Sequence, residues 1–183
     1  MSIPPNSLWR ACAAYFPQPV NENDEHAAQC LDEHVYYFNC RTPQEPLADI
    51  EYRNSSWELD IRSHVFRWDI TPYQWVFENG FSARRQKGTS DNIFFNLDHY
   101  VHHGGRPLDS TRETTHAFVS TTISSAWHPT LPDPGTVCQV YRYEIYAPGS
   151  ILVGDTLGDR YQYCSQDEVC FVAGIASHYI RSA

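Results

Sequence analysis

A carboxylate and an amide stand two residues apart where a short polar turn meets an apolar run. The stretch YCSQDEVCF places Gln166, Asp167 and Glu168 directly before residues 169–172, which read as a buried strand. Strand alternation would point Gln166 and Glu168 to one side and Asp167 to the other. Such a pair suits glycosyl transfer, because the carboxylate stabilises an oxocarbenium-like charge while the amide positions an acceptor. The same residues also fit a turn that only solvates itself.

Two further motifs lie at the ends of predicted strands. Arg67 stands within the apolar run VFRWD and needs an anionic partner if it is buried. That partner is either a structural one, such as Asp69, or a phosphate or pyrophosphate that the guanidinium binds. The run AFVSTTISS ends in Ser120, Thr121 and Thr122, whose hydroxyls can bond the backbone or a neighbouring carboxylate.

The elements that must position these motifs are predicted to be mostly helices in the first part of the main body and strands in its later part. A strand over 64–69 precedes Pro72, which opens a helix over 73–79 that Gly80 ends. Ser90 opens a second, amphipathic helix over 93–101. Further short strands are expected over residues 117–122, 138–145, 150–153 and 169–172. The absence of βαβ alternation predicts an α+β fold with a mostly antiparallel core.

A chain of 183 residues predicts one structural domain. We expect residues 1–62, which are rich in Pro, Asn and acidic residues, to form a lead-in with one helix over 25–38. This lead-in would pack on a main body at 63–183. With 42% hydrophobic and 19% charged residues, the composition is that of a globular protein.

Charge and cysteine content limit the partners. The net charge of −9 provides no basic footprint for nucleic acid. The first residues lack the basic and apolar segments of a secretion signal, so the cytosol or nucleus is expected. The alternative is a secreted mature protein with disulfides, because six cysteines permit three bridges. Their spacing has no CxxC, and no metal site is expected.

The order of the three motifs resembles a known enzyme class. Arg in a first strand, S-T-T ending a second and Q-x-E opening a third is the pattern of the R-S-E class of ADP-ribosyltransferases. The stretches VFRWDITPYQWVFENGF, FVSTT, VYRYEIYAPGSI and DEVCFVAGIASHYIRS resemble four motifs of the pierisin-like members, in the same order. The resemblance spans about two thirds of the chain and implies an ADP-ribosyltransferase fold. That fold has two packed sheets, flanking helices and an NAD cleft, with the catalytic domain at 63–183.

The resemblance also implies site residues. The catalytic set would be Arg67, Ser120, Gln166 and Glu168. The residues around NAD would be Arg67, Trp68, Asp69, Ser120, Thr121, Thr122 and Glu168. The acceptor would meet Gln166, Tyr163 and Trp127. In this scheme Ser120 orients Glu168, the catalytic carboxylate on the nicotinamide ribose. For Trp127 and Tyr163, simple packing is the alternative to stacking on a base.

The activity implied is mono-ADP-ribosylation of guanine, with NAD as substrate and no metal. Arginine-modifying members carry Glu at the position of Gln166, which argues against an arginine acceptor. A protein Asn or Gln side chain, water (as in an NAD glycohydrolase) or a non-catalytic binding module are the alternatives. The charge of −9 is unfavourable for duplex DNA, so a guanine nucleotide or a single strand fits as well. A monomer without membrane contact is expected.

Two departures from the pattern concern the catalytic turn. FVAGI replaces F-P-G-G-I, which removes a Pro and a Gly that would set the course of the backbone after the turn. Cys164 and Cys170 flank the turn and would stiffen it if they were joined to each other or to other cysteines.

Overall fold

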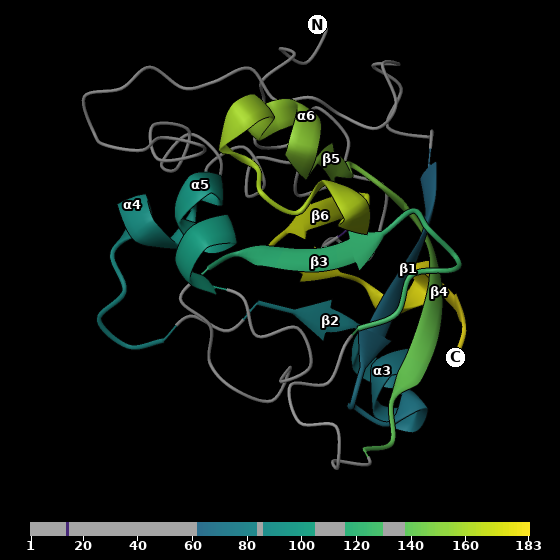
Figure 1. Cartoon of the computed structure of the whole chain (residues 1–183). Coiled ribbons are helices and arrows are strands. Elements are labelled where there is room, and N and C mark those ends of the chain that lie inside the picture. The colour runs from purple at the N-terminus through teal and green to yellow at the C-terminus, as the bar shows by residue number, and fades with distance from the viewer. Residues whose placement is uncertain (1–13, 15–61, 84–85, 105–115, 130–137) are drawn as a thin grey trace, which may run out of the picture.

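The computed structural model describes residue 14 and residues 62–83, 86–104, 116–129 and 138–183 (Figure 1). The strands are β1 (Arg62–Asp69), β2 (Phe81–Ser82), β3 (Phe118–Thr122), β4 (Tyr141–Pro148), β5 (Ile151–Leu152), β6 (Glu168–Val172), β7 (Gly174–Ile175) and β8 (Ile180–Ser182). The α-helices are α3 (Tyr73–Asn79), α4 (Asp91–Phe94), α5 (Leu97–His99) and α6 (Val153–Leu157). A π-helical turn, η1 (Tyr100–Gly104), and three 3₁₀ turns, η2 (Gly158–Arg160), η3 (Cys164–Gln166) and η4 (Ser177–Tyr179), complete the described elements. None of the helices in these ranges is long and apolar enough to cross a membrane.

The described strands form two antiparallel sheets. Six strands follow the order β5-β6-β3-β1-β4-β8, and β2 pairs with β7 in a separate two-stranded sheet. All the strand pairings described in the larger sheet are antiparallel. Phe81 of β2 and Ile175 of β7 belong to the same hydrophobic core as Val65 and Tyr143 of the larger sheet. The expected α+β fold with a mostly antiparallel core in two packed sheets is therefore confirmed.

Burial along the strands explains why β6 reads as a continuous apolar run. All five of its residues are buried, because β6 lies between β3 and β5 and is covered on both faces. In β4, by contrast, the buried residues Tyr143, Ile145 and Ala147 alternate with more exposed ones over most of the strand. The strand that carries Glu168 is thus anchored in the interior of the sheet.

The first expected helix is present with the predicted bounds. Pro72 precedes α3, and Gly80 follows it with a positive φ of 71°. A Cβ at Gly80 would lie 2.3 Å from the backbone oxygen of Ile175, so the close approach of α3 to β7 also requires glycine there.

The single helix expected over 93–101 is wrong. The segment divides into α4, α5 and η1 (Figure 1). Asn96 interrupts it in an extended conformation, and its side chain accepts a hydrogen bond from the backbone N–H of His99 at 2.9 Å. An asparagine that caps a new helix ends the preceding one, and apolar periodicity did not reveal this break.

The later strands are shifted or shorter than expected. β4 begins at Tyr141 rather than at residue 138 and continues to Pro148. β5 is only two residues long, and Val153 already begins α6, a helix that the sequence analysis missed. It also missed β2, β7 and β8, whose two or three residues give too short a pattern to detect.

The predicted lead-in is described at one interior position. Ala14 is fully buried in the hydrophobic core, and its backbone oxygen accepts from the N–H of Ala176 at 2.7 Å. β1 begins at Arg62, the last residue assigned to the lead-in. The helix expected over 25–38 lies outside the described residues.

Candidate active site

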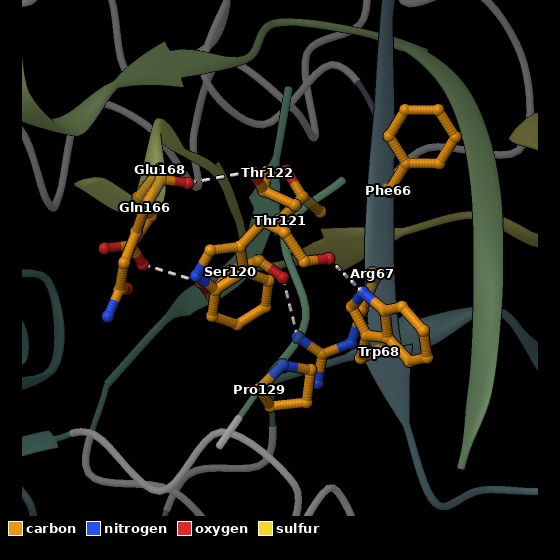
Figure 2. A pocket seen from close by; sticks show the side chains of 10 residues that line it. Phe66, Arg67, Trp68, Ser120, Thr121, Thr122, Pro129, Gln166 and Glu168 are labelled. Carbon is orange, nitrogen blue, oxygen red and sulfur yellow. Dashed lines mark hydrogen bonds between the residues drawn. The ribbon is translucent and has the colours of Figure 1, made fainter. Parts of the chain in front are cut away.

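A pocket opens where β1, β3 and β6 lie side by side. Its lining residues are Phe66, Arg67, Trp68, Ser120, Thr121, Thr122, Trp127, Pro129, Gln166 and Glu168 (Figure 2). The sheet register brings the three sequence motifs together: Phe66 is the Cα partner of Thr122, and Thr122 is the partner of Glu168. Side chains separated by about a hundred residues of chain therefore share one pocket.

The carboxylate of Glu168 is nearly enclosed and strongly hydrogen-bonded. Only 8% of the residue is exposed. Its Oε1 atom accepts from Ser120 Oγ at 2.6 Å and from the Tyr100 hydroxyl at 2.5 Å. Its Oε2 atom accepts from the Tyr161 hydroxyl at 3.0 Å. The expected bond between Ser120 and Glu168 is present.

Tyr100 and Tyr161 are site residues that the sequence analysis missed. They lie in η1 and directly after η2, segments that carry none of the recognised motifs. Burial, followed by the nearby Glu168 carboxylate, raises the pKa of Tyr100 well above its ordinary value. Tyr100 is therefore a permanent hydrogen-bond donor, and only the packing of distant segments reveals it.

Arg67 combines both of the arrangements considered from the sequence. Its Nε and Nη2 donate to Asp69 Oδ2 at 3.0 and 2.7 Å, which confirms a structural salt bridge. Nη1 donates to the backbone oxygen of Ser120 at 2.8 Å, and the guanidinium lies 4.9 Å from the centre of the Phe81 ring. The same side chain lines the pocket, so it also presents positive charge to a ligand there.

Asp69 lies behind Arg67 and not at the pocket. It is fully buried and does not belong to the lining set. Its Oδ1 atom accepts from the backbone N–H and the hydroxyl of Thr71 at 2.9 and 2.8 Å. Asp69 therefore orients Arg67 rather than facing a cofactor directly.

Trp68 and Trp127 are joined at the pocket wall. The indole N–H of Trp68 donates to the backbone oxygen of Trp127 at 3.0 Å. Both residues are in the lining set. This bond fastens the loop after β3 to β1 and holds Trp127 near the ends of the three strands.

The three hydroxyls that end β3 serve different groups. Ser120 bonds the carboxylate, whereas Thr121 Oγ1 donates to the backbone oxygen of Val169 at 2.7 Å. Thr122 Oγ1 donates to the backbone oxygen of Gln166 at 2.8 Å and accepts from Ser124 N–H at 3.0 Å. Both threonines thus fasten β3 to the segment that carries Gln166 and Glu168.

The expected strand alternation from Gln166 to Glu168 is wrong. Gln166 ends η3, Asp167 has a left-handed conformation with φ of 43°, and β6 begins only at Glu168. Both Gln166 and Glu168 nevertheless line the pocket, because the left-handed residue turns the chain between them. In Figure 2 they lie together, with Arg67 and Trp68 on the other side of the view.

Tyr163 stands at the start of η3 outside the pocket lining. It is 44% exposed, and its ring lies 6.0 Å from that of Tyr161. Its backbone oxygen accepts from the N–H of Gln166 at 2.9 Å. An exposed aromatic ring therefore accompanies the turn that carries Gln166.

Cys170 is a free thiol, so of the two states left open by the sequence, bridged or reduced, this residue has the reduced one. Cys170 is completely buried in β6 opposite Ser120, and burial raises the pKa of its thiol well above the ordinary value. Cys138 is also free. Hydrogen bonds from Thr121 and Thr122 hold the turn instead. Within the described ranges, no group of three or more His, Cys, Asp or Glu side chains is arranged to hold a metal ion.

Comparison with known proteins identifies the family. A family model described as Scabin-like matches residues 65–183, well over half of the chain. The chain belongs to the Scabin-like family. This membership confirms the pierisin-like resemblance, and the fold is that of an ADP-ribosyltransferase.

Individual relatives of this Scabin-like chain are of moderate similarity. Pierisin of Pieris brassicae is 33% identical over 131 residues, which are 68% of this chain and 14% of that protein. A guanine-specific ADP-ribosyl transferase of Streptomyces coelicolor is 30% identical over 116 residues, 63% of this chain and 48% of that protein. The structure of Scabin toxin from Streptomyces scabies in complex with NADH is 28% identical in sequence. The match covers 65% of this chain and 61% of that chain, with a TM-score of 0.48. The chain therefore spans less than half of each of the two sequence relatives.

Proposed function

We propose that this Scabin-like chain is an NAD-dependent mono-ADP-ribosyltransferase that transfers ADP-ribose to guanine. One observation carries the proposal: the buried Glu168 carboxylate, held by Ser120, faces the pocket that Arg67 also lines. The name of one relative, the guanine-specific ADP-ribosyl transferase of Streptomyces coelicolor, supports the same reaction and acceptor.

The guanidinium of Arg67 supplies the cationic part of the NAD site. Its bonds to Asp69 and Ser120 use one N–H on each of its three nitrogens. Each terminal nitrogen carries a second N–H, and these remain for the pyrophosphate of NAD. Asp69 limits the movement of the guanidinium, so little side-chain entropy is lost on binding.

The carboxylate of Glu168 supplies the electrostatic part of the reaction. When the bond between the ribose C1′ and nicotinamide breaks, nicotinamide leaves neutral with the bonding electrons, and positive charge develops on the ribose. A fixed carboxylate in a pocket with little water stabilises that charge more than bulk water does. Ser120 holds the carboxylate in place so that it does not reorganise during the step.

The acceptor then approaches from the side of Gln166. The exocyclic amine of guanine attacks C1′ and loses a proton, which gives ADP-ribosyl guanine. Gln166 lines the pocket beside Glu168, and Trp127 also lines it. The exposed ring of Tyr163 lies next to the same turn and is available to stack on a flat base. Because the net charge of −9 is unfavourable for duplex DNA, a guanine nucleotide or a single strand fits as well as a duplex acceptor.

The test is incubation of the full chain with NAD and, separately, GMP, single-stranded DNA, duplex DNA or a protein lysate, with mass spectrometry of each product. We expect a gain of one ADP-ribosyl group on guanine and its absence with Glu168→Gln. Glu144→Gln is the matched control, since Glu144 is an exposed carboxylate bonded to Ser182 and His64. It should retain full activity.

Each other outcome rejects part of the proposal. Nicotinamide release without any adduct would identify an NAD glycohydrolase. An adduct on Asn or Gln of a protein would move the acceptor from guanine to protein. No release from NAD would reject the enzymatic function altogether and leave a binding module.

A second variant separates acceptor binding from NAD cleavage. We expect Gln166→Ala to lower transfer to GMP by about tenfold while nicotinamide release into water continues, because the lost amide positions only the acceptor. Equal loss of both activities would place Gln166 on the NAD side of the reaction.

A further inference from the structure

Three hydroxyl groups surround the carboxylate of Glu168, and two of them belong to tyrosines outside the sequence motifs. Tyr100 and Ser120 bond Oε1, and Tyr161 bonds Oε2. A carboxylate offers about four lone-pair positions to donors. Three of them are filled by these side chains, and one position remains for a ribose hydroxyl.

The helical segment that carries Tyr100 is irregular. The helix expected over 93–101 breaks at Asn96, and the chain continues as a π-helical turn that begins at Tyr100. Such turns cost helix regularity and occur frequently at functional sites. The break brings the Tyr100 hydroxyl to Glu168, and the ring of Tyr100 packs 5.4 Å from that of Phe118 in β3.

An ion pair joins the two segments that carry the tyrosines. Arg160 Nη1 donates to Asp98 Oδ1 at 3.3 Å. Arg160 directly precedes Tyr161, and Asp98 lies two residues before Tyr100. Only 7% of Tyr100 and 6% of Tyr161 is exposed, so neither hydroxyl can exchange freely with water. The two donors therefore have fixed positions on opposite oxygens.

We propose that Tyr100 and Tyr161 are positioning residues that hold the Glu168 carboxylate from both oxygens and leave one acceptor position for NAD. This inference rests on the proposed function. Burial raises the pKa of Tyr100 well above its ordinary value, so its hydroxyl keeps the proton that it donates to Glu168. Without these donors, a buried carboxylate would lose solvation and rotate among several orientations.

Kinetics of Tyr100→Phe and Tyr161→Phe test the proposal, because each change removes a hydroxyl and keeps the ring. We expect kcat for nicotinamide release to fall about ten- to a hundredfold in each variant, with KM for NAD within about twofold. The acid limb of the pH profile of kcat should move to higher pH, because the ionised carboxylate has lost a donor. A purely structural tyrosine would not move this limb.

Tyr141→Phe is the matched control. Its hydroxyl accepts a hydrogen bond from the Gln139 amide at 3.0 Å, away from the pocket. We expect its kcat and pH profile to be those of the wild type. Unchanged kcat and an unchanged acid limb in both Tyr100→Phe and Tyr161→Phe, at wild-type melting temperature, would overturn the proposal.

A measurement without turnover separates this inference from the proposed function. Proton NMR should show a slowly exchanging hydroxyl proton at low field, from the 2.5 Å bond between Tyr100 and Glu168. The resonance should be absent from both Tyr100→Phe and Glu168→Gln and present in Tyr141→Phe. If the resonance were present in a wild-type protein without enzymatic activity, the proposed function would be rejected, but the hydrogen bond between Tyr100 and Glu168 would be confirmed. Its persistence in Tyr100→Phe would overturn the role of Tyr100 even in an active enzyme.

Discussion

The hydroxyl of Thr122 donates to the backbone oxygen of Gln166 at 2.8 Å and so joins the end of β3 to the turn before Glu168. Glu168 itself is the Cα partner of Thr122 in the sheet. Thr122 therefore helps to set the position of the Gln166 amide relative to the Glu168 carboxylate. Strand pairing fixes Glu168, whereas the Thr122 side chain and two backbone bonds, Gln166 N–H to Tyr163 and Ile123 N–H to Asp167, hold the turn.

Thr122→Val should weaken transfer more than NAD cleavage. The substitution keeps the shape of the side chain but removes the bond to Gln166 and the acceptor for Ser124 N–H. We expect the ratio of GMP modification to nicotinamide release to fall about tenfold. Thr156→Val is the control, because its hydroxyl in α6 donates to the backbone oxygen of Leu152, at the end of β5. A ratio that stays at the wild-type value would show that the turn is held by other contacts.

Asp69→Asn should impair NAD binding although Asp69 does not line the pocket. The change removes the negative charge that holds Arg67, while an amide oxygen remains for Thr71. We expect KM for NAD to rise about tenfold and the free energy of unfolding to fall by about 2 kcal/mol. Asp159→Asn, at an exposed site in η2, should change neither value. Steady-state kinetics and thermal melting measure both effects, and an unchanged KM would remove Asp69 from the positioning of Arg67.

Ala173→Gly should stabilise the protein. Ala173 has a φ of 68°, a left-handed conformation that costs a residue with a Cβ about 1 kcal/mol relative to glycine. The strain persists because its N–H and carbonyl bond Ala117 and Ala83 at 2.8 and 2.9 Å. We expect a higher melting temperature. Ala176→Gly, at a φ of −66°, should instead lower it, since it raises the entropy of the unfolded chain and removes a methyl group that packs against the core. A decrease for both variants would contradict the strain at Ala173.

Tyr143 should make the free energy of unfolding depend on pH in the alkaline range. Burial, with Asp69 and Tyr141 nearby, raises the pKa of Tyr143 to about 12. The native state therefore keeps its proton above the ordinary pKa of about 10, at which the unfolded chain releases it. The contribution is complete below pH of about 10 and is lost as pH rises towards 12.

Comparison with Tyr143→Phe isolates this contribution from the other tyrosines. At about pH 8 the variant should be less stable by about 1 kcal/mol, because it lacks the bond from the Tyr143 hydroxyl to the Thr71 oxygen. At about pH 11 the difference should shrink by about 1 kcal/mol, since only the wild type has this proton to lose on unfolding. Chemical denaturation at both pH values measures this difference in the free energy of unfolding. A difference that grows with pH would contradict the direction of the shift.

Sequence alone determined the chemistry of the motifs and the elements with strong local signals. Arg67, Ser120 and Glu168 were recognised from residue type and order, and α3 from Pro72 and Gly80, because these signals depend only on neighbouring residues. The apolar run of β6 predicted a buried strand for the same reason. The α+β fold followed from the order of these elements.

The tertiary structure decided everything that depends on residues distant in the chain. Tyr100 and Tyr161 became donors to Glu168 only when η1 and the segment after η2 packed against β6. Asp69 was placed behind Arg67, and Gln166 reached the pocket through a left-handed turn rather than a strand. A tyrosine in a sequence has no preferred partner, because its bond depends on which buried acceptor the fold places within reach.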